Sequence, residues 1–351
     1  MKIRTFNKTG IITALLLACS ACGFHQVATS AVPTKSYHLV KKLTLGGEGR
    51  WDYLTLDSVA RRLYITRTTR VTVLDTDTGK LVGEIPNTNG VHGVAIANEL
   101  GRGFTSNGRD ATASIFDLKT LKILGTVKTG LDPDAIVYDS FSRRVLTFNG
   151  KSNSATVFDA KTAKVLGNIE LGGTPEFAVA DSLGQVYVNI ESTNEMLTID
   201  ASSLKIKQRS PLSPCTEPTG ISIDVQHKRV FVGCKNQMMA VVDADSGAVK
   251  ATLPIGSGSD AIAFDPSTLQ AFSSNGVGSL TVVQESNDKY TVVDNVATQR
   301  GARTMALDLK THNVFLATAD FEPTPTPTPG QPKIRPKIVP GTFTILIFGQ
   351  K

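Results

Sequence analysis

The sequence has few aromatic residues and lacks the motifs that mark many common enzymes. Phe, Trp and Tyr make up 6% of the 351 residues, with a single tryptophan. There is no GxSxG elbow, no phosphate-cradling glycine loop and no CxxCH haem motif. Because catalysis has no direct support from motifs, the sequence favours a binding protein over an enzyme.

Long apolar runs are also scarce. A short run, "IITALLLA" at residues 11–18, follows Lys2, Arg4 and Lys8 and leads into small residues. It is too short for a mature transmembrane helix. Basic residues, an apolar run and small residues in this order predict an export signal within residues 1–31.

Two cleavage sites for this signal remain open. "LLAC" resembles a bacterial lipobox that would make Cys19 a lipidated first residue, whereas "ATSA" at 28–31 is an ordinary cleavage site. We expect an exported bacterial protein, either periplasmic or held at the outer membrane as a lipoprotein. Any contact with the membrane would be through that lipid anchor.

A strong excess of one charge is missing too. The formal charge of the whole chain is +6, but residues 1–30 hold three basic residues and no acid, so the remainder carries only +3. This is little charge for a nucleic-acid partner.

Cysteine is rare. Two of the four cysteines, Cys19 and Cys22, lie in the leader, which leaves Cys215 and Cys234 as a pair. Beyond the leader there is no CxxC, and no HExxH occurs, so a metal site at this pair lacks further ligands. In an oxidising compartment the pair predicts a disulfide.

Glycine and proline, by contrast, are plentiful, with 30 and 16 residues, and they indicate many tight turns. Four segments align with one another, at residues 91–129, 133–171, 175–212 and 218–255. Each is typical of four short strands separated by polar turns such as "DADSG". Four strands in about 42 residues form one blade of a β-propeller.

Seven such units cover the chain beyond the leader. Their first strands are predicted at residues 51–57, 91–97, 133–139, 175–181, 218–224, 259–265 and 302–308. The fold class is therefore all-β, a seven-bladed β-propeller with four antiparallel strands per blade. The blades lie near residues 46–87, 88–129, 130–171, 172–212, 213–255, 256–298 and 299–350, the last completed by 36–45.

The last blade explains the role of the N-terminal strand. After its third strand, predicted at 342–349, the chain ends one strand short, and "SYHLVKKLTLGG" at 36–47 matches the pattern of a fourth strand. This strand is predicted to close the last blade and to cover an open sheet edge.

Several repeats resemble the YVTN-type, or YncE-like, family of propellers in exported bacterial proteins, whose units are WD40-like in architecture. The resemblance rests on "VYVN" (186–189), "VFDAKTAKVLGNIELGGTPEFAVAD" (157–181) and "VVDADSGAVKATLPIG" (241–256). It implies a seven-bladed scaffold outside the cytoplasm. The family has no single agreed activity, so the resemblance implies no reaction.

A proline-rich insertion, "FEPTPTPTPGQPKIRPKIVPG" at 321–341, expands the turn between the second and third strands of the last blade. Alternating proline excludes helix and favours an extended polyproline conformation. Its basic end contains Lys333, Arg335 and Lys337. The segment is either a tolerated surface insertion or a docking arm beside the ligand face.

One position carries a polar side chain in every blade, five residues before the end of each predicted first strand. It holds Asp52, His92, Asp134, Glu176, Thr219, Asp260 and Arg303. Related by the ring, these residues would surround one mouth of the central channel. They form either a solvated rim or a site for a polar ligand or a hard divalent cation such as calcium.

A second set of polar residues ends the second strands near the same face: Arg67, Asn107, Asn149, Asn189 and Asn275. Asparagine favours tight turns, but we expect these amides to face the same opening. Trp51, beside Asp52, would either stack on a ligand or anchor blade packing.

The leading interpretation is a monomeric binding or scaffolding propeller at the cell envelope, which presents the channel mouth to a small ligand, a cation or an envelope protein. One alternative is a metal-assisted hydrolase or lyase of the lactonase kind that uses Asp134, Glu176, Asp260 and His92. A nucleic-acid-binding propeller is a further alternative, which the acidic ring disfavours.

Overall fold

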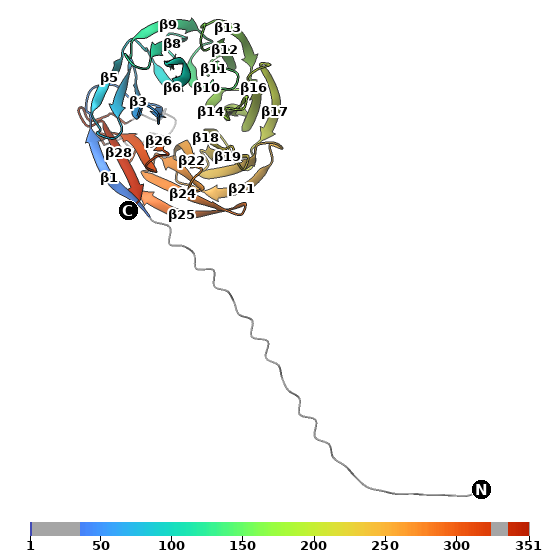
Figure 1. The fold of residues 1–351 in the computed structure, drawn as a ribbon. Helices are drawn as coiled ribbons and strands as arrows, with labels where there is room; N and C mark the ends of the chain where they lie inside the picture. Colours follow the sequence, from blue (N-terminus) through green and yellow to red (C-terminus); the bar gives the residue numbers. More distant parts are fainter. Residues whose placement is uncertain (2–35, 324–335, 351) are drawn as a thin grey trace, which may run out of the picture. The chain divides into compact units, whose positions relative to one another are not determined.

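The computed structural model describes Met1 and residues 36–323 and 336–350. Within these residues the chain forms seven four-stranded antiparallel sheets and two short 3-10 helices, η1 (Asn98–Leu100) and η2 (Glu191–Thr193) (Figure 1). This confirms the predicted all-β, seven-bladed architecture. The predicted export signal and Cys19 lie outside the described residues. No helix of the described ranges is long and apolar enough to cross a membrane.

Each blade is built from consecutive strands. Blade one contains β2 (Leu54–Asp57), β3 (Arg62–Arg67), β4 (Arg70–Asp75) and β5 (Leu81–Ile85). Blade two contains β6 (Val91–Ala97), β7 (Arg102–Asn107), β8 (Thr112–Asp117) and β9 (Ile123–Lys128). Blade three contains β10 (Pro133–Asp139), β11 (Arg144–Asn149), β12 (Ser154–Asp159) and β13 (Val165–Glu170). Blade four contains β14 (Pro175–Ala180), β15 (Gln185–Ile190), β16 (Glu195–Asp200) and β17 (Lys205–Pro211).

Blade five contains β18 (Pro218–Asp224), β19 (Arg229–Cys234), β20 (Met238–Asp243) and β21 (Val249–Pro254). Blade six contains β22 (Ser259–Asp265), β23 (Gln270–Asn275), β24 (Ser279–Ser286) and β25 (Lys289–Ala297). Blade seven contains β26 (Thr304–Asp308), β27 (Asn313–Thr318), β28 (Thr344–Gln350) and, from the other end of the chain, β1 (Tyr37–Thr44).

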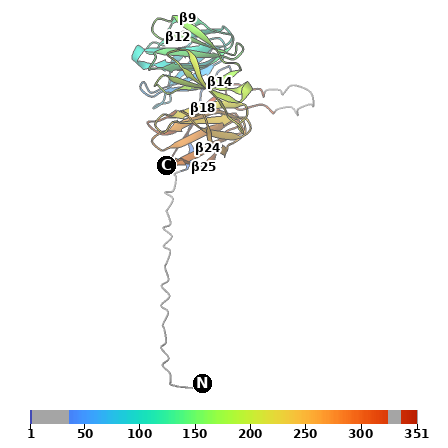
Figure 2. The same cartoon turned by 90° about the vertical axis from the view of Figure 1, so that its right-hand side faces the viewer.

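The first strands of the seven blades line the channel. Each of these strands contacts the first strand of the next blade, and β2 contacts both β6 and β26, so that the ring is complete (Figure 1). The blades are seen edge-on in Figure 2. Because the first strands surround the axis, the ends of these strands on one face form the channel mouth.

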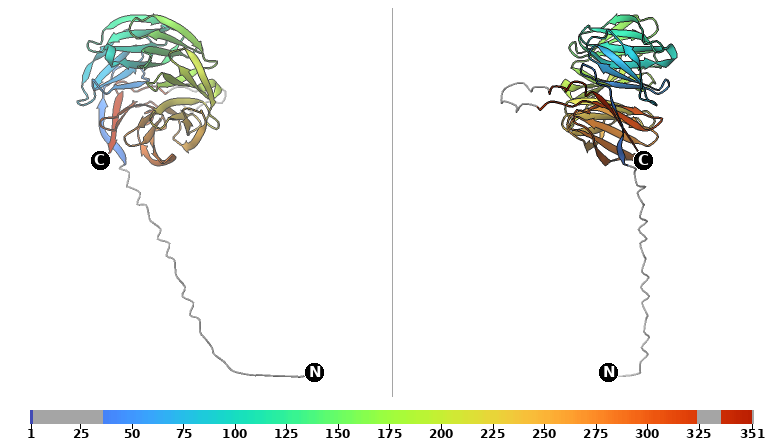
Figure 3. Two further views of the ribbon diagram at one scale, coloured as in Figure 1. Left: turned by 45° about the vertical axis from the view of Figure 1, so that its right-hand side comes forward. Right: turned by 90° about the vertical axis from the view of Figure 1, so that its left-hand side faces the viewer.

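The N-terminal strand closes the ring as predicted. β1 pairs antiparallel with β28, from Tyr37 opposite Gln350 to Thr44 opposite Thr344. Figure 3 shows β1, in blue, beside β28, in red. The Tyr37 ring is buried edge-on against Phe272 of blade six, with 5.2 Å between the ring centroids. The closing strand is therefore held by side-chain packing as well as by the sheet.

The hydrophobic core lies between neighbouring blades. Phe104 of blade two meets Phe158 of blade three with ring centroids 5.8 Å apart, and Phe231 of blade five stacks on Phe264 of blade six at 5.0 Å. All four rings are buried. A buried phenylalanine stabilises a fold by roughly 1.5–3 kcal/mol, so such contacts hold the blades together.

The acid that ends most first strands also ties blades together, on the face opposite the channel mouth. Asp265 of blade six accepts a hydrogen bond from His312 of blade seven at 2.6 Å, and Asp308 of blade seven pairs with Arg61 of blade one at 2.7 Å. Burial raises the pKa of Asp265, but hydrogen bonds from Ser267 and His312 outweigh it and lower that pKa. These acids stay ionised and serve as structural partners.

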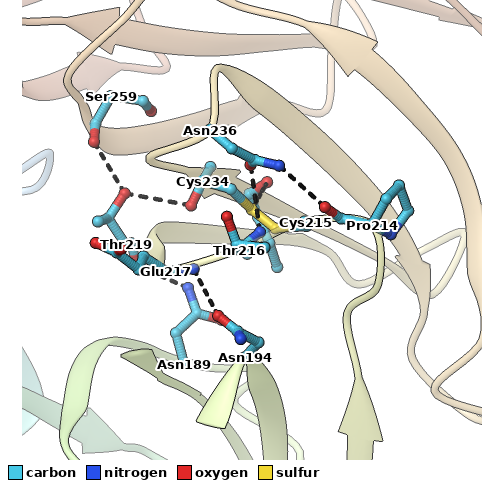
Figure 4. Close-up of a disulfide and its surroundings, with 12 residues drawn as sticks. Asn189, Asn194, Pro214, Cys215, Thr216, Glu217, Thr219, Cys234, Asn236 and Ser259 are labelled. Carbon is cyan, nitrogen blue, oxygen red and sulfur yellow. Dashed lines mark hydrogen bonds between the residues drawn. A yellow bond between two sulfur atoms is a disulfide. The ribbon is translucent and has the colours of Figure 1, made fainter. Parts of the chain in front are cut away.

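The predicted disulfide joins Cys215, just before β18, to Cys234, the last residue of β19 (Figure 4). The two Cα atoms are 5.7 Å apart and both residues are buried. Asn236 bridges the same corner, because its side chain accepts from Thr216 N and donates to Pro214 O. The disulfide therefore fixes the loop that leads into the channel strand of blade five.

The described ends of the proline-rich insertion form a short antiparallel ribbon. Phe321 pairs with Ile338, and Glu322 N donates to Lys337 O at 2.9 Å. The ribbon leaves the ring on one face (Figures 2 and 3). It is the mouth face, since Arg50, in the entry loop of blade one, donates to Pro336 O. Residues 324–335, with Lys333 and Arg335, lie outside the described residues.

Candidate functional site at the channel mouth

A β-bulge places the ring side chains at the start of the innermost strands. In blade three the pairing of β10 with β11 shifts register between Pro133 and Ile136, around Asp134. Blades two, four, five and six carry the same shift. A bulge redirects a side chain that regular pleating would point elsewhere. Asp52 and Arg303 lie just before β2 and β26.

His92 of blade two connects acids of blades one and three. Its Nδ1 lies 2.6 Å from Asp52 Oδ2 and 3.6 Å from Asp134 Oδ1, and its Nε2 lies 3.9 Å from Asp132 Oδ1. Burial lowers the pKa of His92, but the hydrogen bond with Asp52 and the charges of Asp134, Asp52 and Asp132 outweigh burial and raise it to about 9. The imidazole is therefore a cation at neutral pH.

Two ring carboxylates have pKa values close to neutrality. Burial, and then the charges of other acids, raise the pKa of Asp134 to about 7, although His92 opposes the shift. Burial also raises the pKa of Asp260 to about 6 against the effect of Arg303, whose Nε lies 3.2 Å from Asp260 Oδ2. Small changes in the surroundings will therefore change the protonation of both acids.

Glu176 holds its proton. Burial, the charge of Asp134 and a hydrogen bond with Glu191 raise the pKa of Glu176 to about 10. Glu191, in η2, behaves in the opposite way: burial raises its pKa, but hydrogen bonds with Lys235 and Glu176 outweigh burial and lower it. Lys235 forms an ion pair with Glu191 and lies 3.4 Å from Glu217. The Glu191 carboxylate thus accepts hydrogen bonds from two donors, the protonated Glu176 carboxyl and the Lys235 ammonium.

Two aromatic side chains cross the channel next to the ring. Tyr53 of blade one stacks on Phe177 of blade four, with ring centroids 4.0 Å apart and 25° between the planes. Tyr53 packs against the core of blades three and four, and Phe177 packs against the core of blades six and seven. The equivalent residues of the other blades are small: Gly93, Ala135, Gly220, Ala261 and Thr304. The stacked pair therefore forms an aromatic floor beneath the polar mouth.

The Tyr53 hydroxyl and Asp134 Oδ1 are among the buried polar atoms that have no hydrogen-bond partner within the described residues. Burial, and then the charges of Asp134 and Glu176, raise the pKa of Tyr53 well above its ordinary value, so the phenol stays neutral. A neutral phenol and a carboxylate oxygen offer one hydrogen-bond donor and one acceptor to a ligand. Such buried groups are expected to have partners when a site is filled.

The second set of predicted residues lies elsewhere. Asn107, Asn149 and Asn275 are buried and hydrogen-bond to hydroxyl groups of their own blades. Asn107, for example, accepts from Thr105 Oγ1 and donates to Ser114 Oγ, both at 2.8 Å. The expectation that these amides face the opening is therefore not met, because adjacent strands satisfy them.

Asn189 and Thr219 are buried as well. Asn189 Nδ2 donates to Thr219 O at 2.7 Å, which links blades four and five. Thr219 is 2% exposed, and its hydroxyl donates to Ser259 O at 2.9 Å. Of the seven ring residues, Thr219 is the one whose side chain is used within the scaffold.

Arg67 and Trp51 belong to the junction of blades one and seven. The buried Arg67 guanidinium donates to Glu48 O at 2.8 Å and lies 3.7 Å above the centre of the Phe343 ring. Trp51 packs on the same ring at 5.1 Å and on Phe321, at the base of the insertion, at 6.2 Å. Between the two roles proposed for Trp51, these contacts favour the packing anchor.

Several residues of the mouth were not predicted from the sequence: Tyr53, Phe177, Asp132, Glu191 and Lys235. A signal for the aromatic pair was present, since the position after the ring residue holds an aromatic residue in two blades and a small residue in five. Asp132 and Lys235 lie in loops and Glu191 in the short helix η2, where the repeat predicts no side-chain direction.

One group at the mouth has the spacing of a metal site. Donor atoms of Asp52, His92 and Asp134 all lie within 4.8 Å of one another. Two carboxylates and an imidazole could hold a divalent cation. In the protein as described, however, His92 is held by Asp52 and carries a proton.

No protein-family model matches the chain, and no curated protein matches it. Among solved structures, the chain is similar to Kuenenia stuttgartiensis hydrazine synthase, with a TM-score of 0.67, 14% identity, and coverage of 80% of this chain and 94% of that one. At this identity the likeness shows the fold alone. The resemblance to the YVTN-type family therefore stays a prediction.

Proposed function

We propose that the protein is a binding module that takes up a small cation at the channel mouth. The observation that carries this proposal is that four carboxyl groups of the ring face one space, while the ring supplies only two cationic side chains, His92 and Arg303. The four acids are Asp52, Asp134, Glu176 and Asp260. Without a ligand, the negative charge of the ring is reduced by protons on acids that are ordinarily ionised. A bound cation would take the place of those protons.

An organic ammonium or guanidinium group fits the mouth better than a metal ion. Asp134 Oδ1 would accept a hydrogen bond from such a group, and the Tyr53 hydroxyl would donate to an oxygen of the same ligand. The aromatic floor of Tyr53 and Phe177 adds a surface that attracts organic cations. A metal ion bound by Asp52, His92 and Asp134 is the second candidate, favoured by their close donor atoms; it requires His92 to lose its proton.

Thermal unfolding with a panel of cations tests the proposal and separates the two candidates. Ethanolamine, which carries both an ammonium and an oxygen, putrescine and agmatine represent organic cations, and Ca²⁺, Mn²⁺ and Zn²⁺ represent metals. We expect at least one of the six to raise the melting temperature of the wild type and not that of Asp134→Asn. Asp110→Asn, at an exposed acid in the loop between β7 and β8, is the matched control and should respond like the wild type. The proposal is contradicted if no cation of the panel stabilises the wild type, or if each cation stabilises the wild type and Asp134→Asn equally.

We place this function outside the cytoplasm, on the basis of the signal pattern in residues 1–31. Mass spectrometry of the mature N-terminus distinguishes a lipidated Cys19 from cleavage after Ala31. An intact Met1 would refute export by either route. The acidic mouth argues against nucleic acid as its ligand, and catalysis forms no part of the proposal.

A further inference from the structure

A second cluster of metal-binding side chains lies on the face opposite the channel mouth, between blades five and six. Asp224 is the last residue of β18, whose other end carries the mouth residue Thr219. His227 follows in the turn after β18, and Glu285 lies near the end of β24 in the next blade. The cluster therefore lies at the opposite end of the innermost strand from the mouth and shares no residue with it.

The three side chains present a compact set of donors. One oxygen each of Asp224 and Glu285 and one ring nitrogen of His227 lie within 4.8 Å of one another. His227 Nδ1 is 2.6 Å from Asp224 Oδ2. Asp224 is 2% exposed and Glu285 is 7% exposed, whereas the His227 side chain is 40% exposed. Two buried carboxylates thus meet one accessible imidazole.

Glu285 lacks the partner that a buried carboxylate needs. Its Oε2 atom is buried and has no hydrogen bond from any described residue. The nearby Arg229 does not supply one, because its Nη1 pairs with Asp243 at 2.8 Å and its Nε with Asp288 at 3.0 Å. An unpaired buried charge beside a second carboxylate is costly, and a bound cation is one of the few arrangements that removes the cost.

We infer that Asp224, His227 and Glu285 bind a divalent transition-metal ion. The imidazole selects against magnesium and calcium, which take oxygen ligands, and favours ions of the zinc class. Three protein ligands leave coordination positions free on the exposed side of His227, where water or a partner would complete the shell. The ion would bridge blades five and six and add a cross-link to the hydrophobic contacts between them.

A matched pair in the same fold provides the control. His312 Nδ1 lies 2.6 Å from Asp265 Oδ2 at the junction of blades six and seven. No additional histidine, cysteine or acid of the described residues completes a metal-binding group with this pair. His312→Ala therefore removes a histidine–aspartate contact of the same length without touching the proposed ligands.

The test is titration of the full protein with Co²⁺, followed by its visible absorption, with Zn²⁺ as competitor. We expect a saturable spectrum that Zn²⁺ abolishes, retained in His312→Ala and in the mouth variant Asp52→Asn/Asp134→Asn. His227→Ala and Glu285→Gln should each bind Co²⁺ at least about tenfold more weakly. His227 is exposed enough for its variant to fold, and melting temperatures measured without metal are the check that both variants are folded. No saturable spectrum in the wild type, or unchanged affinity in His227→Ala and Glu285→Gln, would overturn the inference.

Discussion

Asp134 shows how a carboxylate comes to stand at the start of a buried strand. The bulge in β10 turns its side chain into the channel mouth, where His92 and three further acids determine its charge. Because burial and the neighbouring acids outweigh His92, the ionised form is less stable than in water. The same residue is therefore a source of instability for the fold and of attraction for a cation.

The first prediction concerns this instability. The pKa of Asp134 is about 7 in the folded protein and 3.8 ordinarily, so the folded state binds its proton more tightly than the unfolded chain. The resulting destabilisation of the folded state is absent below about pH 4, grows as the pH rises to about 7 and reaches its full value above that pH. Asp134→Asn should therefore raise the melting temperature at pH 8 by about 2–4 °C and leave it unchanged at pH 4.

Scanning calorimetry at the two pH values measures this difference. Asp110→Asn, at an exposed acid outside the ring, is the control and should change the melting temperature little at either pH. A melting temperature of Asp134→Asn below that of the wild type at pH 8 would show that Asp134 contributes a favourable ion pair instead.

At the residue level, the repeat predicted which residues stand at the ring position but not what each one does. Asp134 and Thr219 occupy equivalent positions, yet Thr219 is buried and hydrogen-bonded to a neighbouring blade. The Asn107 amide is likewise used inside its own blade. These outcomes depend on partners in other strands, and a repeat alignment does not contain them.

At the level of elements, the first strand of blade one is shorter than predicted. Residues 51–57 were expected, but β2 spans Leu54–Asp57. The preceding residue has partners in two blades: Tyr53 N donates to His92 O of the next blade at 3.3 Å, and Tyr53 O accepts from Thr66 N of β3 at 3.3 Å. The bond to the next blade interrupts the regular ladder with β3, and no local sequence pattern encodes it. The closing strand, by contrast, was predictable because counting strands left one missing.

The closing strand gives a second prediction. Tyr37 is buried, packs on Phe272 and donates a hydrogen bond to His312 O at 3.1 Å. Tyr37→Ala should lower the free energy of unfolding by about 3–5 kcal/mol, as large-to-small changes of buried aromatic residues do. Urea denaturation measures it, with Tyr37→Phe as the control that keeps the ring. A loss below 1 kcal/mol would mean that β1 is not firmly held.

The disulfide gives a third prediction. Cys215 and Cys234 are 19 residues apart, and closing a loop of this size stabilises a fold by about 3 kcal/mol. The free energy of unfolding of the Cys215→Ser/Cys234→Ser variant, measured by urea denaturation, should be lower by that amount. Reduction of the wild type should have the same effect and should not affect the variant. Equal stability of oxidised and reduced wild type would contradict the structural role.

At the level of the whole molecule, seven blades convert one repeated position into a ring of charge. Each blade contributes one residue to the ring, so the four ring acids come from four different blades: one, three, four and six. Composition and spacing were enough to predict the seven blades, since every blade repeats the same strand pattern. The stacking of Tyr53 on Phe177 was not predictable in this way, because it joins blades one and four across the channel.

Isothermal titration calorimetry of the strongest cation from the thermal panel, at pH 6 and pH 8, tests the central claim most directly. Because the cation replaces a proton on Asp134, whose pKa is about 7, we predict about tenfold tighter binding at pH 8, release of a proton on binding at pH 6 but little at pH 8, and loss of binding in Asp52→Asn/Asp134→Asn. Equal affinity at both pH values, or binding that survives in this variant, would contradict the claim that the ring of the channel mouth is a cation site.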